Sequence, residues 1–137
     1  MGMFDTINIS ATGLTAEKFR INVISQNLAN VDTTRTKNGG PYKRKVPIFA
    51  ERFANSGFDE KPDGVEVTGI AVDKAPDRLV YDPHHPDADK NGYVHYPNVD
   101  AVREMVDMIT AQRAYEANAS VINSVKAMVQ SALKIGK

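Results

Sequence analysis

The sequence contains no cysteine and no tryptophan among its 137 residues. The absence of cysteine excludes disulfide bonds, a thiol nucleophile and any cysteine-ligated zinc site. The formal net charge is zero, with 17 basic and 17 acidic residues. This balance argues against a nucleic-acid-binding protein, because phosphate contacts need an excess of Lys and Arg. No run approaches the roughly 18 apolar residues of a membrane-spanning helix, so we expect no insertion into a membrane.

The opening stretch MGMFDTINISATGL also lacks the features of a secretory signal peptide. It has no basic start, carries Asp5 early and never forms a continuous apolar segment. If the protein leaves the cytosol, we therefore expect it to do so without a cleaved signal peptide. A hydrophobic content of 42% with 25% charged residues is ordinary for a folded soluble or helical domain.

Proline is absent from both ends of the chain, and all seven prolines lie between residues 32 and 97. The chain therefore divides into residues 1–31, 32–97 and 98–137. We interpret these as an N-terminal helix of a core domain, a small β-rich or irregular outer segment, and a C-terminal helix of the same core domain. The predicted fold class is α+β, with the two long terminal helices forming an antiparallel coiled-coil-like pair.

Both terminal segments show apolar residues at helical spacing. In the first, Ile7, Leu14, Ile21 and Leu28 form a strict seven-residue repeat. In the second, the apolar pattern changes phase between Ile109 and Ala114, as a coiled-coil stutter does. The predicted packing positions of the second helix are Val102, Val106, Ile109, Ala114, Ala117, Val121, Val125 and Met128.

The middle segment contains four short β-prone runs, at residues 42–49, 65–72, 78–81 and 93–96. Pro and Gly bound these runs, which predicts a small antiparallel β unit.

Two long helices with narrow apolar stripes cannot enclose a large core by themselves. The sequence therefore favours a subunit that buries its helix flanks against other copies. The amide-rich stretch SQNLAN at residues 25–30 fits this interpretation if its polar groups bond across subunits. The alternative is a helix end at which the Asn side chains cap a turn.

The same stretch carries a family resemblance. Residues 25–33, with Ser25, Asn27, Leu28, Ala29, Asn30 and Thr33, resemble the N-terminal signature of the bacterial flagellar rod, hook and hook-associated axial proteins. The stretches GGPY (39–42), APDRLVYDP (75–83), GYV (92–94), RAYEAN (113–118) and KAM (126–128) resemble the basal-body rod proteins of the proximal rod. The similarity covers nearly the whole chain in the same order.

The resemblance implies a structural subunit of the flagellar basal-body rod rather than an enzyme, with no cofactor. Such subunits form the proximal part of the drive shaft in the periplasm and assemble helically through their terminal helices. They reach it through the flagellar type III export apparatus. The implied partners are other copies, the rod proteins FlgB, FlgF and FlgG, and the MS-ring adaptor FliE. The assembly motif is then Ser25, Asn27, Leu28, Ala29, Asn30 and Thr33.

Early rod and hook substrates also resemble one another in an export-gate motif, Phe followed four residues later by a hydrophobic residue. Phe49 with Phe53 matches it, and Phe19 with Val23 matches it too. A pair of Phe residues packing on the β unit explains Phe49 and Phe53 equally well.

A runner-up interpretation is a small monomeric binding module that uses the His/Asp-rich loop at residues 82–95 for a metal or ligand. The run from Asp87 to Gly92 reads like the first half of a calcium loop, but position twelve of that loop is Asn98 rather than Glu. His84, His85 and His95 lie on an irregular segment and are poor candidates for one zinc site. We therefore predict no metal site, and the sequence offers no catalytic constellation.

Charges of opposite sign are separated along the chain. The basic residues are Arg35, Lys37, Lys43, Arg44 and Lys45, and the acidic ones are Asp73, Asp77, Asp82, Asp87, Asp89, Asp100, Glu104 and Asp107. A solvated surface is one explanation, and contacts that set the register between subunits are the other.

Overall fold

The computed structural model describes residues 3–54 and 61–136 of the chain. Its elements are α1 (Met3–Ala29), β1 (Lys45–Ala54), β2 (Lys61–Val72), β3 (Arg78–Tyr81), β4 (Tyr93–Tyr96) and α2 (Ala101–Ile135). Along the sequence, the four strands lie between the two long helices, so the predicted α+β fold class is confirmed. Among the described residues, no helix is long and apolar enough to cross a membrane.

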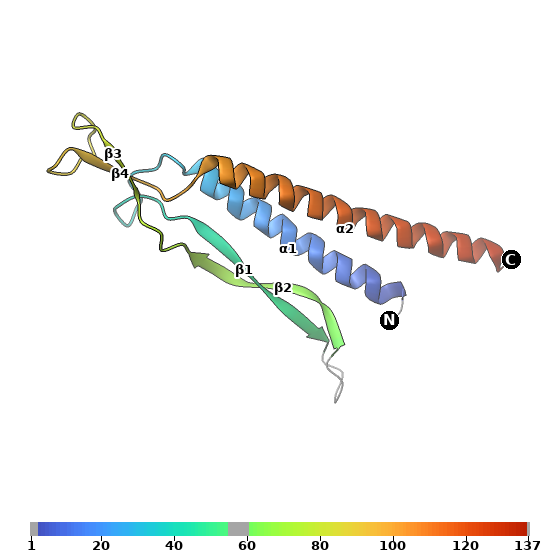
Figure 1. Ribbon diagram of the computed structural model, residues 1–137. Helices are drawn as coiled ribbons and strands as arrows, with labels where there is room; N and C mark the ends of the chain where they lie inside the picture. The colour runs from blue at the N-terminus through green and yellow to red at the C-terminus, as the bar shows by residue number, and fades with distance from the viewer. Residues whose placement is uncertain (1–2, 55–60, 137) are drawn as a thin grey trace.

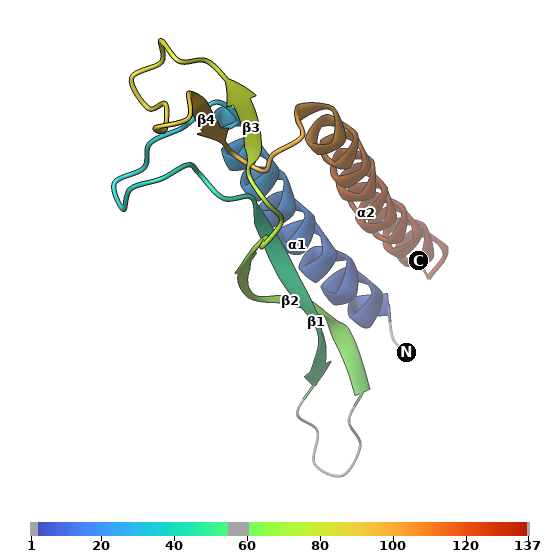
Figure 2. The same ribbon diagram turned by 60° about the vertical axis from the view of Figure 1, so that its left-hand side comes forward.

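The elements form three layers, with α1 between α2 and the β1–β2 ribbon (Figure 1). The turned view in Figure 2 shows the same order, and neither strand of the ribbon packs on α2. The second ribbon, β3–β4, lies beyond the end of the helix pair where α1 ends and α2 begins. At the opposite end, α2 extends past α1.

The two helices pack antiparallel in a regular heptad register. Asn27 of α1 contacts Glu104 of α2, and Gly13 faces Asn118, whose amide nitrogen lies 2.9 Å from where a Cβ at Gly13 would sit. These two contacts are two heptads apart along both helices, as an antiparallel coiled-coil seam requires. The seam positions of α2 are Glu104, Ala111, Asn118 and Val125. The phase change expected between Ile109 and Ala114 is absent from this seam.

α2 is one continuous helix of 35 residues. Asp100 is its N-cap, since its carboxylate accepts hydrogen bonds from the backbone N–H groups of Val102 (3.0 Å) and Arg103 (3.3 Å). These bonds satisfy donors that have no partner within the helix.

The β1–β2 ribbon is antiparallel, with Lys45 opposite Val72 and irregularities after Ile48 and after Glu51. It is held on α1 by Thr12, whose hydroxyl accepts a hydrogen bond from the Val65 N–H at 3.1 Å. Beside this bond, Gly64 has a φ of +112°, and a Cβ there would lie 2.1 Å from the Thr12 hydroxyl oxygen. Only glycine fits this approach of strand to helix.

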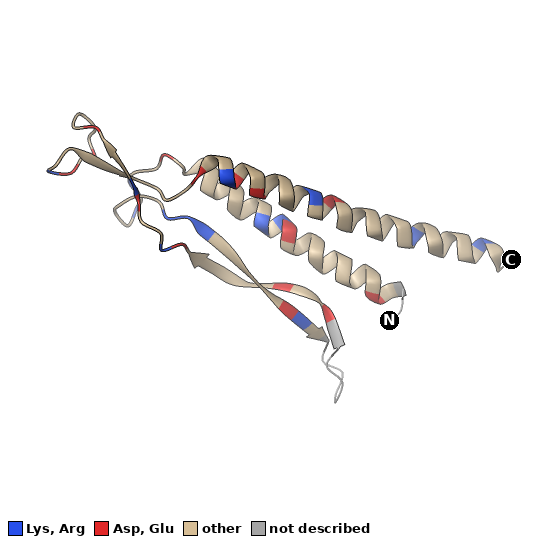
Figure 3. Cartoon of the chain, viewed as in Figure 1, with Lys and Arg blue, Asp and Glu red and all other residues tan. Residues whose placement is uncertain are grey.

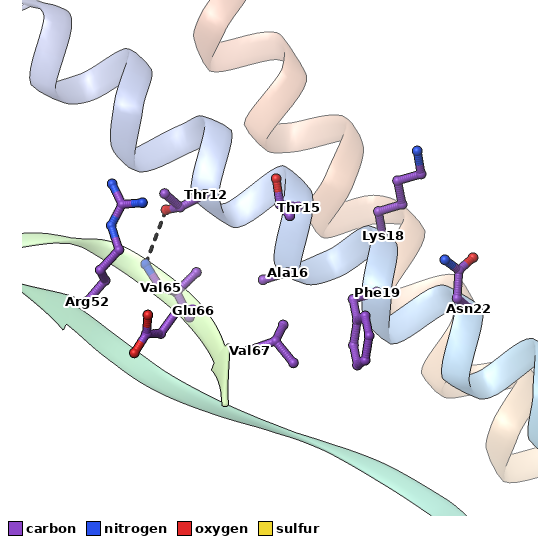
Figure 4. Close-up of a pocket in the computed structure, with 10 residues that line it drawn as sticks. All are labelled: Thr12, Thr15, Ala16, Lys18, Phe19, Asn22, Arg52, Val65, Glu66 and Val67. Carbon is purple, nitrogen blue, oxygen red and sulfur yellow. Dashed lines mark hydrogen bonds between the residues drawn. The ribbon is translucent and has the colours of Figure 1, made fainter. Parts of the chain in front are cut away.

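A groove of about 490 Å³ runs between α1 and the ribbon. Figure 4 shows its apolar floor, made by Ala16, Phe19, Val65 and Val67, and its rim of polar side chains. The helix therefore covers the ribbon only in part.

The two short strands β3 and β4 have the residue ranges that the sequence predicts. Their antiparallel register places Arg78 opposite Tyr96 and Tyr81 opposite Tyr93. The turn before β4 needs Gly92, with a φ of +82°, because a Cβ there would lie 2.9 Å from the Tyr81 ring.

Candidate functional site

The buried side chains with the most polar contacts gather where α1 ends and α2 begins. Asn27 is 1% exposed, and all the hydrogen-bonding capacity of its amide is used. Its nitrogen donates to the Lys45 carbonyl (2.9 Å) and to the Glu104 carboxylate (3.0 Å). Its oxygen accepts from the Tyr42 hydroxyl and from the Lys45 N–H, both at 2.9 Å. One amide thus connects α1, the loop that follows it, β1 and α2.

Glu104 is fully buried in the first turn of α2. Besides Asn27, it accepts a hydrogen bond from the Arg44 guanidinium at 2.5 Å. Arg44 also lies 3.5 Å from Asp73 and 3.6 Å from Asp107. A buried carboxylate is tolerated only when it is paired and hydrogen-bonded, and both conditions are met here.

Asn98, in the segment between β4 and α2, binds to the same region. Its oxygen accepts from the Arg44 N–H at 2.8 Å, and its nitrogen donates to the carbonyls of Asp73 (3.2 Å) and Ala75 (3.1 Å). We call the set Asn27, Tyr42, Arg44, Asn98 and Glu104 the junction. Every member joins segments that are far apart in the sequence.

The electrostatics of the junction follow from its burial. Burial first, and the Glu104 carboxylate second, raise the pKa of the Tyr42 phenol above its ordinary value. Burial lowers the pKa of the Arg44 guanidinium, but the hydrogen bond and charge of Glu104 and the charges of Asp73 and Asp107 outweigh it and raise this pKa. Tyr42 is therefore held as a neutral hydrogen-bond donor and Arg44 as a cation. The arrangement is structural, and it presents no nucleophile paired with a base.

The other residues of the predicted assembly motif end α1 and form the turn after it. Asn30 donates to the Gln26 carbonyl (2.8 Å), and its oxygen accepts from the Thr33 hydroxyl (3.2 Å). Ser25 donates to the Ile21 carbonyl (2.9 Å). Leu28 is half-buried and Ala29 is exposed.

These contacts correct one expectation. For Asn27, the proposed hydrogen bonds across subunits are wrong, because four bonds within the chain use all the capacity of its amide. Asn30 is half-buried and makes two bonds within the chain, so its bonds across subunits stay a prediction. The alternative, a helix end closed by its Asn side chains, describes Asn30. Asn27 fits neither interpretation, since it connects distant segments. That the motif as a whole serves assembly stays a prediction.

The packing positions expected for α2 lie mostly on its outer face. Val102 is 72% exposed, Val106 57% and Ile109 51%, although all are apolar. Val121, Met128 and Ala117 are also exposed, Ala114 is half-buried, and Val125 alone among the eight is buried. The seam against α1 uses Glu104, Ala111 and Asn118 together with Val125, the one expected position that is buried. Contacts of the other positions with further subunits stay a prediction.

On α1, the heptad positions Ile7, Leu14 and Ile21 are all half-buried. The fully buried apolar residues of this helix are Ala16, Val23 and Ile24. The two sets lie on neighbouring stripes, because α1 is covered by α2 on one side and by the ribbon on another.

The two Phe residues of the export-gate pattern lie on β1. Phe49 is 37% exposed and stands opposite Val67, and Phe53 is 49% exposed. The alternative pair, Phe19 and Val23, is in α1, with Val23 buried. In the folded chain Phe49 lines a hollow with Arg20 and Ile24 of α1. A role of Phe49 and Phe53 in export stays a prediction.

The His/Asp-rich loop at residues 82–95 is held by hydrogen bonds. Asp87 accepts from the Thr34 hydroxyl (2.9 Å) and pairs with Arg35, and these contacts, led by the Thr34 bond, lower the pKa of its carboxyl. Asp89 accepts from the Tyr93 N–H (2.9 Å) and the Asn91 N–H (2.8 Å), which lowers its pKa as well. Among the described residues, no group of three or more His, Cys, Asp or Glu side chains could hold a metal ion.

The charges that are separated along the sequence meet in the fold. Arg35 pairs with Asp87, Lys43 with Asp77, and Arg44 with Asp73, Glu104 and Asp107. These pairs favour a role of the charges within the folded chain, and the expectation that the two groups set the register between subunits stays a prediction.

Comparisons with known proteins agree with this arrangement. The family described as "Flagella basal body rod protein" matches residues 7–37, and the family described as "Flagellar basal body rod FlgEFG protein C-terminal" matches residues 90–135. A flagellar basal-body rod protein FlgC of Borreliella burgdorferi is 54% identical, over 98% of both chains. The chain belongs to the FlgC family of flagellar basal-body rod proteins. The FlgC proteins of Bacillus subtilis (45% identical) and Escherichia coli (40%) match over the full length of both chains.

FlgC proteins are structural proteins of the rod, and this member of the family is not an enzyme. The two matched segments together contain three of the five junction residues. Asn27 lies in the first matched segment, Asn98 and Glu104 lie in the second, and Tyr42 and Arg44 lie between the two. The Asn27–Glu104 contact is therefore one of the contacts that join the two segments.

Sequence reasoning missed the roles of Tyr42, Arg44, Asn98 and Glu104 in the junction. In the sequence, Glu104 was grouped only with other acidic residues, as part of a solvated surface or of contacts between subunits. One signal was available in the sequence. Glu104, Ala111, Asn118 and Val125 recur every seven residues, so a carboxylate occupies a core position of an otherwise uncharged seam.

Proposed function

We propose that this chain is a self-assembling subunit of the proximal flagellar rod and that the exposed face of α2 is its main assembly surface. The observation that carries the proposal is the outer stripe of Val102, Met105, Val106 and Ile109, which are 51–72% exposed. Contiguous exposed apolar surface on a folded protein marks an interaction site. Helical spacing along one continuous helix fits packing against neighbouring helices.

The finer points rest on the resemblance to rod proteins. The chain would be exported unfolded by the flagellar type III apparatus, without a cleaved signal peptide, and would assemble helically in the periplasm. FlgB, FlgF and FlgG are its expected neighbours, and FliE is its expected link to the MS ring. The division into a helical core (1–31 and 98–137) and an outer segment (32–97) belongs to the same proposal.

The test places a charge on the outer stripe without disturbing the fold. Val106→Asp and Ile109→Asp are introduced into a strain that lacks its own copy of this gene. Because both side chains are exposed, the stability of the purified chain should change by no more than about 0.5 kcal/mol. Swimming motility and rods in electron micrographs of basal bodies should be lost.

The matched control is Asn91→Asp, which adds the same charge at an exposed polar position in the turn before β4, away from α2, and should leave both readouts intact. Normal rods and motility in both stripe variants would show that the face is not an assembly surface. A strain that still forms rods without any copy of this gene would remove the rod function itself.

A further inference from the structure

Strand β3 is exposed along its whole length. All four of its residues are exposed, and three of them carry large apolar or aromatic side chains: Leu79 at 56%, Val80 at 38% and Tyr81 at 65% exposure. Among the described residues it pairs with β4 alone, in a two-stranded sheet. An uncovered, apolar strand at the edge of a sheet is a docking site for a further strand.

The backbone groups at this edge follow from the register of β3 and β4. Asp82 donates its N–H to the Gly92 carbonyl at 2.9 Å, one residue beyond the paired strands. Because bonded and non-bonded pairs alternate in an antiparallel ladder, Leu79 and Tyr81 point their N–H and C=O groups away from β4. Within residues 3–54 and 61–136, none of these four groups has a hydrogen-bond partner.

The other edge of this ribbon is closed at the corresponding point. Tyr93 of β4 stands opposite Tyr81. Its N–H donates to the Asp89 carboxylate at 2.9 Å, and its carbonyl accepts from the Asp89 N–H at 2.8 Å. A further strand is therefore easier to place beside β3 than beside β4.

We propose that β3 pairs with β3 of a second copy, antiparallel and around a two-fold axis at Val80. In this register Leu79 of each copy stands opposite Tyr81 of the other, and each such pair exchanges two N–H···O bonds. The four outward groups of both strands are all satisfied. The Leu79 and Tyr81 side chains of the two copies also lie side by side on one face, where cross-strand pairs stabilise a sheet.

Charge and register select a second copy as the occupant of this edge. Arg78 is the only Lys, Arg, Asp or Glu of β3 and β4, and acidic positions lie in the loop after β3 (Figure 3). The two-fold register sets Arg78 of each copy opposite Asp82 of the other. A shift by two residues in one direction sets Leu79 opposite Pro83, which has no N–H to donate. A shift in the other direction removes the pairing of the charges.

Neither of these charges is fully used within its own chain. Arg78 lies 3.8 Å from Asp32 and 5.1 Å from the centre of the Tyr96 ring, and its side chain is 56% exposed. Asp82 accepts a hydrogen bond from the His84 N–H at 3.1 Å, and a carboxylate can accept several. Exposed ion pairs add little affinity. The charges therefore set the register, and the backbone bonds and apolar contacts supply most of the binding.

This pair of copies is separate from the assembly proposed for α2. The β3–β4 ribbon lies beyond the end of the helix pair (Figure 1). A two-fold contact uses the same patch in both copies and closes at two, whereas a rod repeats a contact along its length. The β3 pair is therefore a state of the free subunits, in which each copy covers the open edge of the other. It goes beyond the proposed function, and its test needs no rod.

The absence of cysteine makes the two-fold axis directly testable. In Val80→Cys the thiols of two copies stand opposite each other, with about 4.5 Å between the Cα atoms. A disulfide tolerates this distance. The purified full-length chain, incubated with oxidised glutathione, should give a disulfide-linked dimer on a non-reducing gel.

The matched control is Leu79→Cys in the same strand. Its two thiols are diagonal neighbours in the proposed register, about 8 Å apart, which exceeds the roughly 7 Å between Cα atoms that a disulfide tolerates. Leu79 is more exposed than Val80, so random collisions would favour the control. Several-fold more dimer in Val80→Cys is the expected result. As much dimer in the control would overturn the proposal and leave the rod function untouched.

Charge variants give an independent measurement by analytical ultracentrifugation of the purified chain. Arg78→Glu should raise the dissociation constant of the dimer roughly threefold to tenfold, because two exposed ion pairs are lost. Asp82→Lys in the same chain exchanges the two charges and should restore most of the affinity. Lys90→Glu, an exposed position of the neighbouring loop, should leave the dissociation constant unchanged. A natural chain that stays monomeric at every concentration, or a double variant as weak as Arg78→Glu, would overturn the pairing.

Discussion

The junction buries polar side chains, whereas the outer face of α2 exposes apolar ones. The junction buries an amide and a carboxylate, Asn27 and Glu104, at 1% and 0% exposure and pairs each of them. The outer face leaves Val102, Val106 and Ile109 more than half exposed. Both features contradict the rule that apolar side chains are buried and polar ones exposed.

Under the proposed function, the difference separates what the chain needs in order to fold from what it exposes for contacts with other subunits. Hydrogen bonds fix direction and distance, so the junction defines how three segments meet. Apolar burial has little directionality, so the stripe on α2 can be left for a neighbour whose contact completes it. The junction should therefore control the stability of the single chain, and the outer face should control assembly. Four measurements test this separation.

The largest effect is expected for Glu104→Ala. The substitution removes the hydrogen-bonded carboxylate of Arg44, which keeps only the more distant Asp73 and Asp107, and one partner of Asn27. Breaking a buried ion pair from one side costs about 3–5 kcal/mol. The free energy of unfolding, measured by chemical denaturation of the purified chain, should fall by this amount or the variant should be unfolded. Glu116→Ala, an exposed acidic position of the same helix, should change it by no more than about 0.5 kcal/mol. Equal effects of the two substitutions would remove the special role of the junction.

Asn27→Leu is expected to have the next largest effect. It leaves the buried Tyr42 hydroxyl without its partner, which costs about 1–3 kcal/mol. It also removes the partner of both backbone groups of Lys45, but these are only partly buried, so water can replace the amide. Asn30→Leu breaks only bonds within the helix end, which predicts a loss of roughly 0.5–1.5 kcal/mol. Rod assembly should be lost in the Asn27 variant as a consequence of its folding defect. A stable but non-assembling Asn27 variant would instead support a direct contact with other subunits.

Two positions three residues apart on α2 compare the seam with the outer face. Val125 is 4% exposed and Met128 is 56% exposed. Val125→Ala should lower the free energy of unfolding by roughly 1–3 kcal/mol because it opens a cavity, whereas Met128→Ala should change it by no more than about 0.5 kcal/mol. Thermal unfolding followed by circular dichroism measures both. The reverse order would mean that the seam is assigned to the wrong face.

The smallest effect is a loss of stability at alkaline pH. Burial first, and Glu104 second, raise the pKa of Tyr42. A raised pKa contributes stability that is fully present below the unfolded-state value, about 10, and is lost as the pH rises through the folded-state value. The unfolding free energy should therefore fall above about pH 10 more steeply in the natural chain than in Tyr42→Phe. Parallel curves would show that Tyr42 does not contribute to the pH dependence.

Much of the fold follows from local patterns that the sequence displays. The proline-free ends predict the helices, and β3 and β4 have their expected bounds. β1 was expected at residues 42–49 but is found at 45–54, because its extent depends on pairing with β2 across two irregularities. No local pattern in the sequence specifies which residues of two strands pair with each other.

The face of α2 that packs on α1 could not be chosen from periodicity. Val102, Val106 and Ile109 have the spacing of a packed stripe whether the partner is α1 or another subunit. The seam itself contains Glu104 and Asn118, which a search for apolar repeats passes over. The apparent phase change near Ile109 arose because positions from both faces were read as one stripe.

The sequence by itself determined the class of the fold, the presence of its two helices, the ends of its two short strands and the family, because these depend on local propensity, on Pro and Gly and on short motifs. Only the tertiary structure decided the junction and which face of α2 packs on α1. Asn27, Arg44 and Glu104 acquire their roles from contacts between residues up to 77 positions apart. Such contacts have no local signature, since the free energy of each buried polar group depends on partners that the fold brings to it.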